Sequence, residues 1–344
     1  MTTLAHYSNL TLYSAMAVYT LAMLGYAVYL TAVAPQTARE VQAREAANAR
    51  EAAYARAGAL VGTGAGGRLG EEGPSLDAQA PSSDGPAAAS GPSRAAQAGG
   101  IATSLAYLGT GLLIASVVLR GLSVGRWPLG NMFEFGTFAC MLVMTFFLAW
   151  STRRDLRWLG LFLVAPVLLV LGMASTVWYT EAAELMPSLR SYWLVIHVTV
   201  ATISVALFTI GAATAVLYLV QLRVEASGGS RLLSRFMARL PRSLALEKLT
   251  YGLHVVAFPL WTFTLIAGAI WARQAWGSYW NWDPKEVWTF IIWVVYAAYL
   301  HAHATRGWSR AQATYVALAG FACILVNYGI VNMYFVSQHS YSGL

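Results

Sequence analysis

The sequence predicts an all-α polytopic membrane protein with about eight transmembrane helices. Its 344 residues are 58% hydrophobic and only 11% charged, whereas a soluble domain carries about 25% charged residues. Apolar runs of about 20 residues, the length that crosses a bilayer, recur along the chain. The net charge of +7 comes without any nucleic-acid-binding motif, so we interpret it as membrane topology and expect no nucleic-acid partner.

The apolar runs are separated by polar connections, and each run is close to the length that a bilayer requires. The fifth run is longer, so its helix should tilt or project from the membrane. The eight predicted spans are residues 10–34, 101–121, 131–151, 157–176, 191–222, 249–272, 284–304 and 312–336.

Residues 36–100 differ sharply from these spans. They are rich in Ala, Gly, Ser and Pro and lack the apolar side chains that could bury a core. Only residues 38–58 have the composition of a helix, through local Arg/Glu pairs. We therefore divide the chain into a first transmembrane span at 1–35, a mostly disordered cytoplasmic linker at 36–100, and a transmembrane domain at 101–344.

Arginine residues are concentrated in alternate connections, which predicts the topology. They cluster between spans three and four, five and six, and seven and eight, and the positive-inside rule assigns these connections to the cytoplasm. The other connections carry few cations. Both termini and the loop at 273–288 are therefore predicted to be extracytoplasmic.

The loop at 273–288 joins spans six and seven and is rich in tryptophan. Its segment Asp283–Glu286 has the pattern of a capping box with proline at the first helical position, which would open span seven. This pattern does not explain Trp276, Trp280 and Trp282. An aromatic belt at the membrane interface is the ordinary explanation, but their concentration in one loop favours a stacking platform for a flat, apolar ligand with charged edges, such as haem.

Two histidines are predicted to lie on the same side of the membrane as this loop. His197 lies about six residues into span five, roughly 9 Å below its outer end, and His339 follows the outer end of span eight. Two neutral imidazoles can bind a haem iron from both axial positions. A hydrogen bond across a helix interface is the alternative for either residue.

Deeper histidines allow a second hypothesis. His254 and His301 lie near the inner ends of spans six and seven, at comparable depth, so an inner haem site could form between them. His303 follows His301 by two residues and faces away from it around a helix. The alternative for His254 and His303 is a side chain that reaches the membrane interface without binding a ligand.

Other polar residues could contribute to a haem site, but the sequence does not show which of them bind the propionates. Haem propionates require cations, and Glu134, just inside span three, requires a partner. The chain has no Cys-x-x-Cys and no Cys-x-x-Cys-His, which excludes a thiol-disulfide oxidoreductase and a c-type cytochrome. The extracytoplasmic cations available for propionates are Arg126, Arg190, Arg273 and Lys285.

The loop sequence Trp-Gly-x-x-Trp-x-Trp-Asp-Pro-Lys-Glu at 276–286 resembles the WWD signature of haem-handling proteins in cytochrome c biogenesis. Further motifs resemble the System II proteins of the CcsA/ResC type, called CcsB in actinobacteria. The resemblance covers residues 101–344. The additional motifs lie at 128–135, 187–197, 258–262, 299–301 and 339–341.

The resemblance implies two haem sites. His301 would be a ligand of the inner site, and the family's other inner ligand is usually on a ResB-type membrane partner, which weakens the hypothesis for His254. At the outer site two histidines would ligate haem b while the loop holds the porphyrin. The implied outer set is His197, His339, Trp276, Trp280, Trp282 and Asp283.

The implied function is that of a cytochrome c synthase (haem lyase) subunit that moves haem outward across a bacterial plasma membrane. It would present haem for thioether attachment to Cys-x-x-Cys-His of apocytochrome c, with a ResB-type protein, a thioredoxin-like reductant and membrane lipid as partners. Two alternatives remain: a System I-like haem-delivery protein and a b-type bis-histidine electron-transfer cytochrome. A channel would explain the spans but not the motifs.

Overall fold

The structure is a computed structural model that describes residues 3–32, 94–182, 185, 190–227 and 229–339. Within these ranges the chain forms helices and no strands, and eight helices are long and apolar enough to cross a membrane. The predicted all-α transmembrane fold is therefore confirmed.

In the described part of the chain, a short helix, α6, covers Arg231–Met237 in the connection between α5 and α7. The last span changes from α-helix to a π-helical turn, Val326–Val331, and then to the short helix α10, Asn332–Tyr334. The spans are Thr3–Ala32, α2 (Arg94–Val124), α3 (Met132–Ser151), α4 (Arg157–Thr176), α5 (Tyr192–Ser227), α7 (Ser243–Trp276), α8 (Pro284–Ala304) and α9 (Arg310–Leu325), the last continued to Tyr334.

Predicted and observed boundaries agree closely for α3, α4 and α8, and two of these helices begin at a capping signal. The side chain of Asn131 caps α3 by accepting a hydrogen bond from the Glu134 N–H, and Asp283 and Glu286 form the predicted capping box of α8. In contrast, α2 begins at Arg94, before the predicted boundary at 101. Strong helix formers between Arg94 and the apolar run explain the longer helix. The rest of the predicted linker, 36–93, and the last residues of the predicted first span, 33–35, lie outside the described residues.

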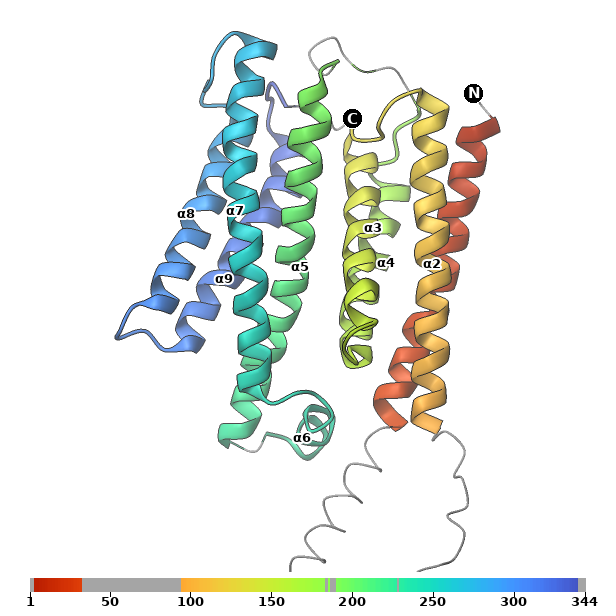
Figure 1. Ribbon diagram of the computed structural model, residues 1–344, viewed down its shortest axis with the longest axis vertical. Coiled ribbons are helices and arrows are strands. Elements are labelled where there is room, and N and C mark those ends of the chain that lie inside the picture. The colour runs from red at the N-terminus through yellow and green to blue at the C-terminus, as the bar shows by residue number, and fades with distance from the viewer. Residues whose placement is uncertain (1–2, 33–93, 183–184, 186–189, 228, 340–344) are drawn as a thin grey trace, which may run out of the picture.

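The helices form two groups that meet at α5 (Figure 1). Buried side chains of the first span, α2, α3 and α4 share one core with α5 residues such as Ala206 and Ile210. Phe208, between them in sequence, belongs to a second core with α7, α8 and α9. Opposite faces of α5 therefore serve the two cores, which requires a helix apolar on all sides.

Helices α5 and α7 run antiparallel and pack closely through two reciprocal pairs. His197 of α5 lies over Gly268 of α7, and His254 of α7 lies over Gly211 of α5. A Cβ atom would lie 2.7 Å from His197 Cε1 at Gly268 and 2.6 Å from His254 Cε1 at Gly211. Small residues at such positions allow membrane helices to approach.

A buried carboxylate fixes α7, α8 and α9 at one end of the bundle. Glu247 of α7 accepts hydrogen bonds from His303 Nε2 at 2.6 Å and from Arg310 Nη1 at 2.7 Å. The His303 ring also stacks on Tyr251, with ring centroids 3.9 Å apart. His303 is therefore a structural residue, which gives it more than the interfacial role that the sequence suggests.

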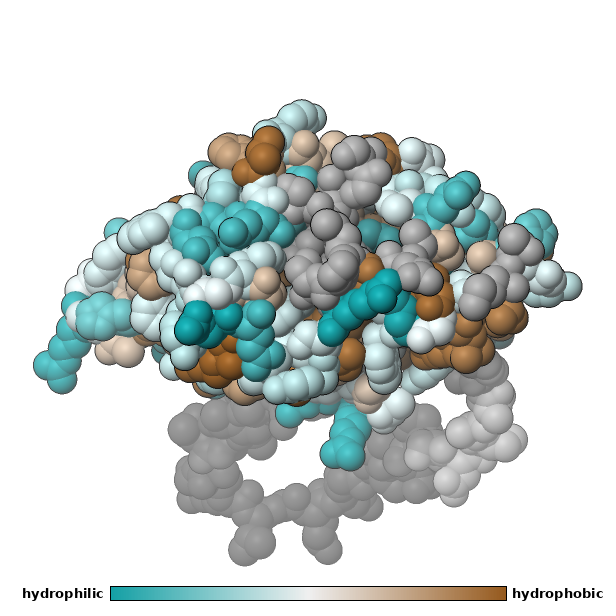
Figure 2. Space-filling view, turned by 90° about the horizontal axis from the view of Figure 1, so that it is seen from above, coloured by the Kyte–Doolittle hydropathy of each residue, from teal (hydrophilic) through white to brown (hydrophobic). Residues whose placement is uncertain are grey.

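The loop between α7 and α8, residues 277–283, lies at the other end, which we call the tryptophan end. Both ends of the described chain also lie there (Figure 1). Seen from above, this end is mainly polar, with apolar residues between the polar groups (Figure 2). Two residues of this loop, Tyr279 and Trp280, line the candidate cavity.

Candidate functional site

A cavity of about 430 Å³ lies between the two groups of helices. Its wall is formed by residues of α3, α4, α5, α7, α8 and α9, together with the loop at the tryptophan end. Cavities that bind cofactors are typically about 300–1,000 Å³ and mostly apolar, with a few polar groups that converge. This cavity has those properties.

The cavity extends from the tryptophan end deep into the membrane. On α5 its lining residues follow one helical face from Leu194 through His197, Ala201 and Val205 to Thr209. At 1.5 Å per residue, this stripe is about 22 Å long. The stripe is therefore long in comparison with a hydrocarbon core about 30 Å thick.

The cavity also reaches the lipid-facing side of the protein between α4 and α9. Leu169 and Leu325 line it and are 66% and 54% exposed. Nearer the tryptophan end this side is closed, because the Tyr328 hydroxyl donates to the Met132 carbonyl at 2.7 Å and the Tyr328 ring contacts Trp178. The opening therefore lies between residues that are within the predicted spans and not at their ends.

His197 projects into the cavity from α5. Its Nδ1 is buried and has no hydrogen-bond partner, and its ring lies over Gly268, where only the absence of a Cβ makes room. Trp271 lies on another side, with ring centroids 5.7 Å apart. A buried, unsatisfied imidazole nitrogen beside a cavity is a suitable metal ligand.

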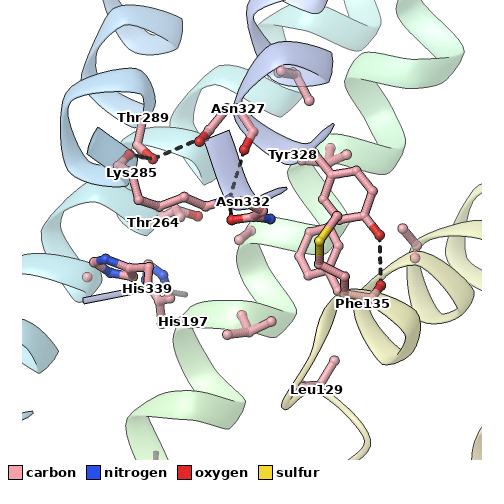
Figure 3. A pocket seen from close by; sticks show the side chains of 18 of the residues that line it. Leu129, Phe135, His197, Thr264, Lys285, Thr289, Asn327, Tyr328, Asn332 and His339 are labelled. Atoms are coloured by element: carbon pink, nitrogen blue, oxygen red, sulfur yellow. Dashed lines mark hydrogen bonds between the residues drawn. The ribbon is translucent and has the colours of Figure 1, made fainter. Parts of the chain in front are cut away.

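His339 lines the same cavity, from the turn that follows α10 (Figure 3). Its Nδ1 hydrogen bonds to Asp283 Oδ1 at 3.1 Å, and its ring lies edge-on to Trp276, with centroids 4.6 Å apart. A carboxylate on one imidazole nitrogen orients the other for metal binding. Asp283 thus caps α8 and positions His339, whereas its sequence pattern indicates mainly the cap.

The charge of Asp283 is stabilised by this arrangement. Burial raises the pKa of its carboxyl, but hydrogen bonds from the His339 ring and from the Gln338 and Lys285 N–H groups outweigh burial and lower the pKa below its ordinary value. Because the pKa is lower in the folded protein, the ionised carboxylate stabilises the fold at pH values above the ordinary pKa of Asp. This stabilisation is lost as the pH falls through the lowered pKa. At neutral pH the carboxylate is therefore available to hold His339.

Two of the three tryptophans named from the sequence reach the cavity. Trp276 and Trp280 line it. Trp282 does not line it: its side chain is 77% exposed and contacts Trp280 edge-on at 5.8 Å. Its φ of 57° is in the left-handed region, which is rare for a bulky residue. Trp282 therefore belongs to the rim of the site.

The structure does not bring His254 and His301 together. His254 is fully buried among the rings of Phe208, Tyr296 and Tyr299, outside the cavity. His301 lies on the exposed face of α8. Because Tyr299 is buried on the opposite face of that turn, a site made by both histidines of this chain would require α8 to rotate.

Residues 129–339 match a family model described as cytochrome C assembly protein. The chain belongs to this family. The matched segment begins and ends with cavity residues, Leu129 and His339, and includes every residue that lines the cavity. The family match and the candidate site therefore cover the same part of this cytochrome c assembly protein.

Curated relatives of the assembly protein are named cytochrome c biogenesis protein CcsA. The relative from Guillardia theta is 34% identical over 263 residues, which is 69% of this chain and 86% of that protein. One from Parasynechococcus marenigrum is 34% identical over 272 residues, 70% of this chain and 86% of that protein. One from Prochlorococcus marinus is 36% identical over 278 residues, 70% and 84% of the two chains. This protein is thus a multi-span membrane protein of cytochrome c biogenesis.

Proposed function

We propose that this protein is the haem-handling subunit of a cytochrome c synthase. It holds haem b as substrate between His197 and His339 and presents it to the Cys-x-x-Cys-His motif of apocytochrome c. The observation that carries the proposal is the convergence of these two histidines, one from α5 and one from the turn after α10, with Trp276 and Trp280 in one deep apolar cavity. Membership of the cytochrome c assembly family supports it.

The two histidines suit axial ligation in different ways. The His197 ring is held rigidly between α5 and α7, and its unsatisfied Nδ1 gains a partner if iron binds there. His339 is oriented through the Asp283 bond at Nδ1, which assigns ligation to Nε2. Two imidazoles on opposite faces of the porphyrin fix the height and tilt of haem in the cavity.

The reaction itself requires positioning more than acid-base chemistry. Each cysteine thiol of the apocytochrome adds across one vinyl group: sulfur bonds to the carbon next to the porphyrin, and a proton completes the terminal carbon. The addition has no net oxidation, so the thiols must arrive reduced, which is the task of the thioredoxin-like reductant. Holding the vinyl groups still while the thiols approach supplies the rate advantage of an intramolecular reaction.

We place the tryptophan end on the extracytoplasmic face of a bacterial plasma membrane. The support is the distribution of arginine: the connections that follow α3, α5 and α8 are rich in it and lie at the opposite end of the bundle. Apocytochrome c would then meet the exposed rim around Trp282 on the outside, where holocytochromes c function.

The function is tested by purifying the protein with a ResB-type partner, adding a reduced reporter apocytochrome c and recording pyridine haemochrome spectra. We expect the b-type spectrum to be replaced by the c-type spectrum of a haem with two thioethers. A b-type spectrum that persists while the protein only transfers or retains haem would favour the delivery or electron-transfer alternatives.

We assign His301 to the inner haem site, completed by the ResB-type partner. Its place on the exposed face of α8, at the end opposite the tryptophans, suits a ligand shared between two proteins. The His301→Gly variant should copurify with less haem, and added imidazole should restore the loss by occupying the space of the missing ring. His6→Gly, which removes an exposed histidine from the first span, serves as control. Full haem occupancy in His301→Gly would remove His301 from the haem path.

A further inference from the structure

Lys285 lies in the first turn of α8 with its side chain in the cavity that holds His197 and His339 (Figure 3). Its ammonium donates to Asn332 Oδ1 at 2.8 Å and to the Asn327 carbonyl at 3.2 Å. Both partners are neutral. The ammonium is therefore solvated by dipoles, and no carboxylate of the described residues forms an ion pair with it.

The nearby carboxylates are used elsewhere. The Asp283 oxygens accept hydrogen bonds from His339 and from the Gln338 and Lys285 N–H groups. Glu286 Oε2 accepts from the Asn281 and Asp283 N–H groups, while Oε1 has no partner. In the described part of the chain, no carboxylate oxygen lies within 4.0 Å of the Lys285 ammonium. A desolvated cation without an anion is costly, which points to an anionic ligand.

The last span departs from α-helical geometry where it contacts this lysine. Val326–Val331 forms a π-helical turn, which is rare and frequently marks functional sites. The turn supplies the Asn327 carbonyl, and Asn332 follows it directly. The Asn327 side chain donates to Thr289 Oγ1 at 3.4 Å, which ties the turn to α8. The ammonium is therefore held in one place, as an anion site requires.

Of the four cations that the sequence suggests for propionates, only Lys285 lines the cavity among the described residues. Arg126 pairs with Glu134 at 2.8 Å, and Arg120 contacts the same buried carboxylate at 3.1 Å. Arg273 hydrogen bonds to the Gly277 carbonyl at the end of its own helix. Its position in the cavity and these contacts of the arginines favour Lys285 as the cation that binds a propionate.

We infer that Lys285 binds a haem propionate and thereby sets which edge of the porphyrin faces outward. The inference rests on the proposed function, since it assumes that haem occupies the cavity. The propionates and vinyl groups lie on opposite edges of haem. A propionate held at α8 therefore turns the vinyl groups away from Lys285 and leaves them for the thiols.

The test compares haem with haem dimethyl ester, in which both propionates are uncharged, by spectroscopic titration of the full chain in complex with its partner. Hydrogen bonds to charged groups contribute about 1.5–3 kcal/mol, so Lys285→Met should bind haem about 10- to 100-fold more weakly. The wild type and Lys285→Met should bind the ester equally well. Lys285→Arg should recover part of the affinity for haem, and Lys248→Met, at the only other lysine and exposed on α7, should bind both ligands as the wild type does.

A second variant leaves the lysine intact. Asn332→Asp places a carboxylate against the ammonium and should weaken the binding of haem while sparing the ester, even if Lys285→Met does not fold. Two results would overturn the role of Lys285 while leaving the proposed function intact. One is equal affinity for haem in Asn332→Asp and the wild type, and the other is a loss of affinity that is the same for haem and for the ester. A wild-type protein that binds neither ligand would overturn the proposed function and this inference with it.

Discussion

Replacing either His197 or His339 with alanine should abolish covalent attachment of haem to a reporter apocytochrome c. His197 comes from α5 and His339 from the turn that follows α10, and both line one cavity, so neither can take over the other's position. With one axial ligand missing, the porphyrin is free to tilt and the vinyl groups leave the path of the thiols. A displacement of about 1 Å in such a site can cost about 100-fold in rate, so product should fall to background.

The measurement is haem staining of the denatured reporter after incubation with the purified complex, together with its pyridine haemochrome spectrum. His6→Ala provides the control, because His6 is exposed on the first span, far along the chain from the cavity residues. Wild-type amounts of covalent product in both His197→Ala and His339→Ala would exclude the proposed function.

The second large effect is expected from a single methyl group at Gly268. A Cβ atom there would lie 2.7 Å from Cε1 and 3.2 Å from Nδ1 of His197, so the imidazole must move. Gly268→Ala should therefore reduce thioether formation by about 10- to 100-fold, since it displaces a ligand without removing any chemical group.

The matched control is Gly109→Ala on α2. A Cβ atom at Gly109 would lie 2.9 Å from the ring of Tyr19, away from the cavity, so this variant suffers similar crowding against an aromatic ring. The thermal midpoints and thioether yields of both variants are compared with the wild type. If both variants lose stability and activity alike, crowding in general explains the result, and the position of His197 has no special importance.

The sequence predicts much of this fold because membrane helices can be recognised from their length and apolar composition. Where a cap or a proline marks the end, as at Asp283 and Pro284, the predicted boundary agrees with the structure. The depth argument also places His197 and His339 on the same side of the membrane, because alternate connections return to the same side. Their meeting in one cavity needed the structure, since depth says nothing about direction around a helix.

The features that the sequence did not predict depend on neighbours in space. His254 turns toward Gly211 because a residue without a Cβ leaves room there, and that pairing joins positions on two helices. The π-helical turn that supplies the Asn327 carbonyl to Lys285 contains one glycine, Gly329, but this does not distinguish it from the other membrane helices, which also contain glycine. Trp282 belongs to the same motif as Trp276 and Trp280, yet its backbone conformation turns it away from the cavity.

The lipid-facing opening between α4 and α9 has a thermodynamic consequence for ligand selection. Leu169 and Leu325 line the cavity and are exposed on this side, so in a bilayer the acyl chains would reach the cavity, and a porphyrin that enters would exchange places with hydrocarbon. Lipid tails are as apolar as the side chains of the wall, and such an exchange yields little hydrophobic free energy. The long apolar wall therefore selects by shape, and affinity must come from the few polar groups at the tryptophan end.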